Sequence, residues 1–267
     1  MRGGSQSHLM RASDGNLYVV KFQNNPQHVR VLTNEIIVTR LAEAAGLSVP
    51  ACEIVEVSDW IIQNTPDMHM QIGSQRIPCK PGLAYGSRYA LSPVEGQVLD
   101  WIPQSMVDRV RNLDELPGML AFDKWVCNSD SRQAVFSRRS RERKYKAVFI
   151  DHGYCFNAAE WTFPDAPLRG TYPWNEVYAG VKGWESFEPW LSRLEQMKED
   201  AIFSCGDVVP PEWYASDAEA LEKLLAALIK RRSRIRELIE SFRHSSRNPF
   251  PNWQLTQSLT GTARSQD

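Results

Sequence analysis

Strand-forming and helix-forming patterns occupy different parts of this chain, and their separation is the strongest constraint on its fold. The first clear strand is LYVVKF at residues 17–22, preceded by the turn signal Asp-Gly-Asn at 14–16, which favours a hairpin. From Pro173 onward the periodicity becomes helical. With 267 residues, of which 42% are hydrophobic, the chain can form one large domain or two packed lobes, and two lobes is our working hypothesis.

One helix is predicted in the first hundred residues, over residues 27–45. Asn25 can cap it, Pro26 suits its first turn and Gly46 ends it. Short strands are predicted at residues 51–57 and 60–63. The polar stretch 64–93, which contains Pro and Gly, has no convincing helix and is expected to be irregular. Residues 98–102 indicate a strand or a linker.

The rest of the chain is predicted to be mainly helical. Two strands, at residues 134–136 and 145–150, flank the basic turn 138–144 and suggest a hairpin. The predicted helices are residues 105–111, 116–126, 174–181, 186–204 and 217–243. Ser216 with Glu219 is typical of a capping box for the last helix. Residues 254–267 are polar, and we expect a flexible tail.

Composition excludes several classes of protein. The chain has 31 Lys and Arg residues and 32 Asp and Glu residues, so it lacks the excess of positive charge that non-specific nucleic-acid binding requires. Direct DNA binding is therefore not expected. No run approaches the roughly 18 apolar residues of a membrane helix, and the first ten residues lack a signal-peptide core, so we predict a cytoplasmic protein. The five cysteines form no Cys-x-x-Cys pair and are expected to be reduced, so oxygen atoms would hold any metal.

The N-terminal residues offer candidates for phosphate binding. Gly3, Gly4 and Ser5 begin a small-residue loop whose backbone N–H groups could surround phosphate, because glycine permits close approach. Lys21 lies in the strand 17–22, which would direct its ammonium to one face of a sheet. Glu35 follows in the middle of the helix 27–45 and could pair with Lys21. Each residue also has an alternative without a function. Gly3, Gly4 and Ser5 would then form an irregular N-terminal loop, Lys21 would lie on the surface of a strand, and Glu35 would lie on the solvated face of its helix.

Two acidic positions follow later in the chain. Asp130 lies in the segment NSDSRQ, and Asp151 ends the apolar strand AVFI, where Gly153 allows a sharp turn. A carboxylate at that place suits a metal, although an Asp in a simple turn is the alternative. Phosphoryl transfer needs amides around phosphate, a cation, a base for the acceptor hydroxyl and carboxylates on Mg²⁺. The order of these features is the order of parts in a kinase.

Five segments together resemble the HipA-like kinase superfamily over about Arg2 to Trp190: GGSQSH, LYVVKF, NEIIVTRLAEAAGLSVP, FDKWVCNSDSRQ and FIDHGYCF. The resemblance implies an α+β, two-lobed protein-kinase-like fold. Residues 1–102 would form a small β-rich N-lobe with one helix, and residues 103–253 a mainly helical C-lobe after a hinge near 98–103. It also implies that ATP and Mg²⁺ are the cofactors. Lys21 would bind the nucleotide phosphates, Glu35 would orient Lys21, Asp130 would be the base and Asp151 the Mg²⁺ ligand.

The catalytic segment departs from the family pattern. Such kinases place an Asn that holds Mg²⁺ five residues after the catalytic Asp, but Val135 stands there in this chain and cannot bind metal. Gln133 could supply an amide oxygen instead. Alternatively, Asp123 with Asn128 has the five-residue spacing and gives a second register. We favour Asp130 as the base because Asp123 sits within an apolar helical run.

Three functions compete. The first is a Ser/Thr protein kinase or autokinase that binds ATP and phosphorylates a protein or small-molecule acceptor. The second, suggested by Val135, is a nucleotide-binding pseudokinase, and the third is a non-catalytic interaction protein that uses its Trp-rich C-lobe.

The strand expected before the Gly-rich loop is absent from the sequence, so either the natural chain starts upstream or the N-lobe sheet lacks an edge strand. The basic run 138–144 is typical of a solvated turn, and alternatively could contact an acidic substrate.

Overall fold

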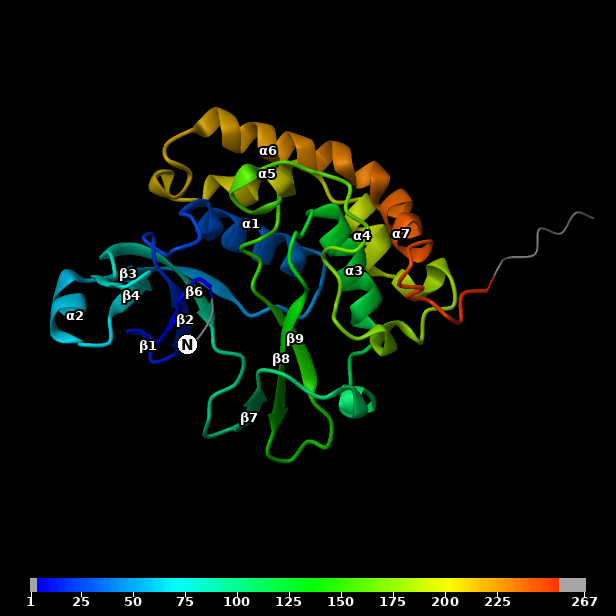
Figure 1. The fold of residues 1–267 in the computed structure, drawn as a ribbon, viewed down its shortest axis with the longest axis horizontal. Coiled ribbons are helices and arrows are strands. Elements are labelled where there is room, and N and C mark those ends of the chain that lie inside the picture. Colours follow the sequence, from blue (N-terminus) through cyan, green and yellow to red (C-terminus); the bar gives the residue numbers. More distant parts are fainter. Residues whose placement is uncertain (1–3, 255–267) are drawn as a thin grey trace, which may run out of the picture.

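The first part of the chain forms a four-stranded antiparallel sheet. The computed structural model describes residues 4–254, so Gly3 and the predicted tail beyond Gln254 lie outside the described range. The strand order is β1-β2-β6-β3 (Figure 1). Its strands are β1 (His8–Arg11), β2 (Leu17–Lys21), β3 (Cys52–Val57) and β6 (Gly82–Arg88). At one end of it lie α2 (Asp59–Asn64) and the hairpin of β4 (His69–Ile72) with β5 (Gln75–Pro78).

The predicted hairpin between β1 and β2 is confirmed. Asp14 accepts a hydrogen bond from the Asn16 backbone N–H at 2.9 Å, and Gly15 takes the left-handed φ of +82° that the turn requires. Alternation along β2 buries Tyr18 and Val20 in a small apolar cluster. Because successive side chains of a strand point to opposite faces, Lys21 projects to the other side of the sheet.

Helix α1 (Arg30–Ala44) lies between this sheet and α5 (Glu199–Asp207), which covers it on the far side (Figure 1). It is therefore buried on nearly all sides, including the polar Asn34 and Glu35. The helix begins three residues later than predicted. The Asn25 carboxamide oxygen accepts the N–H groups of Gln27 and His28 and forms a turn before the helix.

The C-terminal part joins a three-stranded antiparallel sheet to a set of helices. The sheet contains β7 (Gly96–Leu99), β8 (Gln133–Arg139) and β9 (Lys146–Ile150) in that order. The chain enters it from β6 through residues 89–95, here called the linking segment. The helices are α3 (Glu115–Trp125), α4 (Trp190–Glu195), α5, α6 (Ala218–Arg231) and α7 (Ile235–Arg243). α3 packs on α4 and α7, and its fully buried Phe122 and Trp125 belong to the main core.

Several local predictions were wrong. Residues 60–63 belong to α2, where Ser58 caps the helix, and residues 64–93 contain β4, β5 and β6. The single helices predicted at 186–204 and 217–243 are each broken, the first into a 3₁₀ turn (Trp184–Phe187), α4 and α5, the second into α6, a 3₁₀ turn (Arg232–Arg234) and α7. Residues 105–111 and 174–181 contain only the 3₁₀ turns Gln104–Arg109 and Asn175–Tyr178. Asp217, not Ser216, caps α6.

No helix within residues 4–254 has both the length and the hydropathy that crossing a bilayer requires. All five cysteines are free and buried, as the sequence predicts. Two further 3₁₀ turns, Ala158–Glu160 and Pro211–Tyr214, pack against α1 from the C-terminal part of the chain.

Gly118 inside α3 gives a test of this packing. A Cβ atom there would lie 2.4 Å from the Trp190 ring. Gly→Ala in an exposed helix gains about 1 kcal/mol, but overpacking a core costs about 1–3 kcal/mol. We expect Gly118→Ala to lower the free energy of unfolding in urea by about 1–2 kcal/mol. Gly180→Ala is the control, because nothing lies within 4 Å of its Cβ position. Equal stability of the two variants would contradict the packing described.

Candidate active site

A cavity of about 610 Å³ separates the four-stranded sheet from β8 and β9. Its walls include Val19 and Lys21 of β2, Glu35 of α1, Gln133 of β8 and Asp151, which follows β9. The volume falls within the range of about 300–1,000 Å³ that is usual for small-molecule sites. This cleft therefore brings together four side chains that the sequence singles out.

Three ionisable side chains meet at the inner wall of the cleft. The Lys21 ammonium donates to the Asp151 Oδ1 at 2.8 Å and also to the Glu35 carboxylate. The side chains of Lys21 and Glu35 are 8% and 2% exposed, whereas that of Asp151 is 34% exposed. The contact joins β2, α1 and the residue after β9, and Asp151 is the most exposed of the three side chains.

Lys21, Glu35 and Asp151, here called the triad, influence one another's pKa values. Burial lowers the pKa of Lys21, but the two carboxylates outweigh it and raise that pKa above its usual value, so Lys21 is a cation. Burial raises the pKa of Asp151, but Lys21 outweighs it and the pKa lies below the usual value. Burial raises the pKa of Glu35 despite the attraction of Lys21. Asp151, whose pKa is lowered and whose side chain is the most exposed of the three, is therefore the carboxylate that a further cation in the cleft would contact.

A buried ion pair fixes the backbone just before Asp151. Arg132 donates through Nε to Asp123 Oδ2 at 2.9 Å and through Nη1 to the Ile150 carbonyl at 2.7 Å. Asp123 and Arg132 are 1% and 2% exposed. Asp151 itself has a φ of +61°, a left-handed conformation that an L side chain rarely adopts. Arg132 therefore holds the end of β9 where this strained turn begins.

Asn34 ties the loop after Asp151 to α1. Its carboxamide NH₂ group lies within hydrogen-bond distance of the carbonyls of Gly153, Cys155 and Ala158, at 2.8, 3.0 and 2.9 Å. Its oxygen accepts the Trp161 indole N–H at 2.9 Å. Because Glu35 is the next residue on α1, the same helix positions Glu35 and the Asp151 loop. Sequence reasoning missed Asn34, since nothing local marks partners more than a hundred residues away.

The two catalytic candidates lie in different environments. Gln133 is the first residue of β8 and pairs with Ile150, so it lines the cleft near Asp151. Asp130 is exposed and does not line the cleft, and its carboxylate accepts the Ser131 N–H at 2.7 Å. The Gly170 N–H donates to the Asp130 carbonyl at 2.9 Å and fixes its backbone. Among the loop candidates, Gly4 and Ser5 line the cleft.

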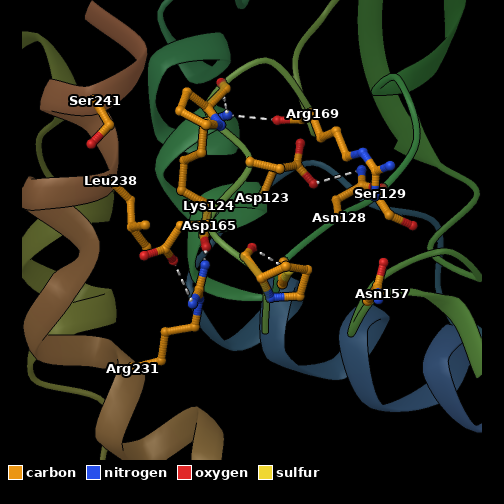
Figure 2. Close-up of a pocket in the computed structure, with 14 residues that line it drawn as sticks. Asp123, Lys124, Asn128, Ser129, Asn157, Asp165, Arg169, Arg231, Leu238 and Ser241 are labelled. Atoms are coloured by element: carbon orange, nitrogen blue, oxygen red, sulfur yellow. Dashed lines mark hydrogen bonds and ion pairs between the residues drawn. The ribbon is translucent and has the colours of Figure 1, made fainter. Parts of the chain in front are cut away.

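Asp123 and Asn128, the alternative register, lie elsewhere. Figure 2 shows them beside a separate pocket of about 20 Å³, which has room for about one water molecule. Asn128 donates to Asp123 Oδ1 at 3.0 Å, and Arg132 binds both oxygens of that carboxylate. Asp123 is therefore fully engaged and is poorly suited to be a base. Asn128 lies outside the lining of the cleft, where it holds Asp123 and accepts the Asp130 backbone N–H.

The donor set near Asp151 fits a hard cation such as Mg²⁺. Within residues 4–254, no three or more His, Cys, Asp or Glu side chains gather in a way that could hold a metal. Mg²⁺ does not need such a cage, because it is usually bound by one or two carboxylates, substrate phosphates and water. One carboxylate from Asp151 and one amide oxygen from Gln133 match that requirement.

Comparison with known proteins decides the family. The model of the HipA-like kinase family matches residues 1–245. The chain belongs to this family. No curated protein matches the chain. The resemblance seen in the sequence is thus confirmed, and by its family and its fold the HipA-like chain is a kinase-like phosphotransferase.

Solved kinases share the fold at low sequence identity. The Golgi casein kinase with Mn and ADP bound has a TM-score of 0.53 and 13% identity, over 92% of this chain and 72% of that one. The Helicobacter pylori proinflammatory kinase CtkA has a TM-score of 0.51 and 14% identity, over 87% and 94%. HipA of Shewanella oneidensis MR-1, in a complex with HipB and operator DNA, has a TM-score of 0.50 and 14% identity, over 90% and 66%. The predicted kinase-like α+β fold is therefore confirmed.

The Asp123–Arg132 pair gives a second test. Arg132→Met would leave the Asp123 carboxylate buried without a cation, which typically costs about 3–5 kcal/mol. We expect a loss of that order in the free energy of unfolding, measured in urea. Lys223→Met is the matched control, since it removes a Lys–Glu pair whose side chains are 73% and 76% exposed, and no measurable change is expected. The double variant Asp123→Leu/Arg132→Met should be more stable than Arg132→Met alone. Similar effects of Arg132→Met and Lys223→Met would show that the buried pair is not needed.

Proposed function

We propose that this HipA-like chain is an ATP- and Mg²⁺-dependent kinase that phosphorylates a Ser or Thr hydroxyl of a protein, or of itself. The observation that supports it most directly is Lys21, whose buried ammonium bridges Glu35 and Asp151 at the wall of a nucleotide-sized cleft. An ammonium at this place can bind nucleotide phosphates, and Glu35 holds it in position. Gly4 and Ser5, on the same cleft, would add backbone N–H groups for the phosphates.

The metal would be held by Asp151 and Gln133 together with the phosphates. A bound divalent cation would neutralise charge on the transferred phosphoryl group. Asp151 now contacts Lys21 through Oδ1, and its 34% exposure leaves the carboxylate accessible from the cleft. The Golgi casein kinase with Mn and ADP bound supports nucleotide and divalent-metal use in this fold.

Asp130 is our candidate for the base that accepts the proton of the acceptor hydroxyl. Its carboxylate is exposed, so a protein acceptor can reach it, and its backbone is fixed by Asn128 and Gly170. Asp130 precedes Arg132 by two residues and Gln133 by three, and both of these residues line the cleft.

Nucleotide binding is tested by thermal stability with and without ATP and Mg²⁺. A ligand that binds only the native state raises the unfolding midpoint. At a ligand concentration of a hundred times Kd, it adds about 2.7 kcal/mol to the free energy of unfolding. We expect a Mg²⁺-dependent rise that is lost in Lys21→Met and in Asp151→Asn. Lys182→Met, an exposed lysine outside the cleft, is the control and should keep the full rise.

The basal midpoint of each variant is measured first, because Lys21→Met leaves two carboxylates without their cation. Asp151→Asn preserves shape and keeps the test valid if Lys21→Met does not fold. Absence of any rise in the folded wild-type protein would refute the nucleotide site.

Phosphoryl transfer is tested separately, with labelled ATP and a Ser/Thr-containing protein acceptor. Asp130→Ala should lower the rate by about 10²–10⁴-fold, the usual contribution of an acid–base group, while nucleotide binding stays unchanged. Asp108→Ala, an exposed carboxylate on the 3₁₀ turn before α3, is the control and should retain activity.

Nucleotide binding without transfer is the second candidate function. It is favoured by Val135, a half-buried apolar residue five positions after Asp130, where an Asn metal ligand would stand in such kinases. Binding in the thermal assay together with no transfer in the wild-type protein would establish this pseudokinase function instead of the kinase.

A further inference from the structure

A second large cavity, here called the basic groove, lies on the other side of the linking segment. Its volume is about 650 Å³, and it runs from the N-terminal sheet and residues 49–51 to the face of β8 and β9 that also borders the cleft, farther along both strands. Pro50, Arg88, Tyr89 and Ala90 line both the groove and the nucleotide-sized cleft. The two cavities therefore share a wall but open to different sides of it.

Charge distinguishes this groove from the rest of the molecule. Five cationic side chains line it against two carboxylates, Glu95 and Glu142, which gives a local net charge of +3. The chain as a whole has a net charge of −1. The five cations come from both walls of the groove and are Arg11, Arg88, Arg111, Arg139 and Lys146.

Three of these cations are not neutralised by a carboxylate. Arg11 donates to the Gly15 carbonyl at 2.9 Å, and Arg88 donates to the Asn16 side-chain oxygen at 2.8 Å. These neutral acceptors orient the two guanidinium groups, and Arg88 also lies close enough to the Asp14 carboxylate to lower its pKa without forming an ion pair with it. Lys146 has no side-chain hydrogen bond or ion pair with any residue between 4 and 254. The groove therefore holds free positive charge on both walls.

The other two cations pair loosely, and the positive surface extends beyond them. Arg111 contacts Glu142 at 2.9 Å, and Arg139 approaches Glu95 only to 4.0 Å. All four side chains are 31–66% exposed, so these pairs exchange readily with an incoming anion. The turn between β8 and β9, at the lower end of the sheet in Figure 1, adds the exposed Arg141, Arg143 and Lys144 next to the groove.

We propose that the basic groove binds an acidic segment, rich in Asp and Glu, of a partner protein. Guanidinium groups bind carboxylates in paired hydrogen bonds, and four of the five cations are arginines. A cavity of this size takes in a few residues of extended chain. The inference does not depend on the proposed kinase function, since no residue assigned to transfer lines the groove.

Shape and lining argue for a polypeptide over a nucleic acid. Single-stranded nucleic acid is usually bound by aromatic side chains on which the bases stack, but Tyr89 is the one aromatic residue in the lining. The cations face one another across a cavity and do not follow a long convex surface, so a duplex would contact few of them. The net charge of −1 also offers no long-range attraction for a long polyanion.

The test measures binding of fluorescein-labelled hexaglutamate to the full chain by fluorescence anisotropy, at low salt and at about 0.15 M ionic strength. We expect saturable binding that weakens with salt, and no binding of hexaglutamine. The variant Arg11→Gln/Lys146→Gln should weaken binding about tenfold at low salt, because it removes one free cation from each wall. If that variant has a lowered thermal midpoint, Arg139→Gln/Lys146→Gln replaces it.

The matched control is Lys182→Gln/Lys198→Gln, which changes the net charge equally with two exposed lysines that do not line the groove. It should bind hexaglutamate within about twofold of the wild-type protein. The proposal is overturned by no hexaglutamate binding, or by equal loss in the groove and control variants, which would indicate diffuse attraction. It is also overturned if a single-stranded oligonucleotide of six phosphates binds more tightly than hexaglutamate and loses that affinity in the groove variant.

Discussion

The buried Lys21 ammonium is the interaction on which the organisation of this molecule depends. It joins a strand of the N-terminal sheet, a helix packed behind that sheet and the first residue after β9, through Glu35 and Asp151. Breaking such a contact leaves uncompensated buried charge, so the three elements are coupled strongly. Without Glu35 and Asp151, the buried Lys21 ammonium would destabilise the fold. With them, it is held in a position from which it can bind phosphate.

Two polar contacts outside the triad explain how Asp151 keeps its unfavourable backbone conformation. Arg132 holds the Ile150 carbonyl from one side, and Asn34 holds the Gly153 carbonyl from the other. A left-handed φ at a non-glycine residue persists where the surroundings determine it on both sides. The loop is thus preorganised by α1 and by the buried Asp123–Arg132 pair, through contacts made within the chain.

The sequence predicted the parts of the site that follow from local periodicity and from the ordered family motifs. Lys21 and Glu35 fall in a clear strand and a clear helix, and Asp151 follows an apolar strand. β6 was missed because glycine weakens a strand pattern, yet a Cβ at Gly86 would lie 2.9 Å from Val55 and the close approach requires glycine. Asn34 and Arg132 were missed as positioning residues because their partners become neighbours only in the folded chain. The broken helices were missed because apolar periodicity continues across the breaks.

The linking segment gives the molecule one wall with two differently charged sides. On one side, the cleft is lined by three cations and three carboxylates, so its formal charges balance. On the other side the basic groove has excess positive charge. Because Arg88, Tyr89 and Ala90 line both cavities, a molecule bound in the groove would contact the same residues that border the cleft. The two cavities thus have these three residues as a common boundary, although the charges that line them differ.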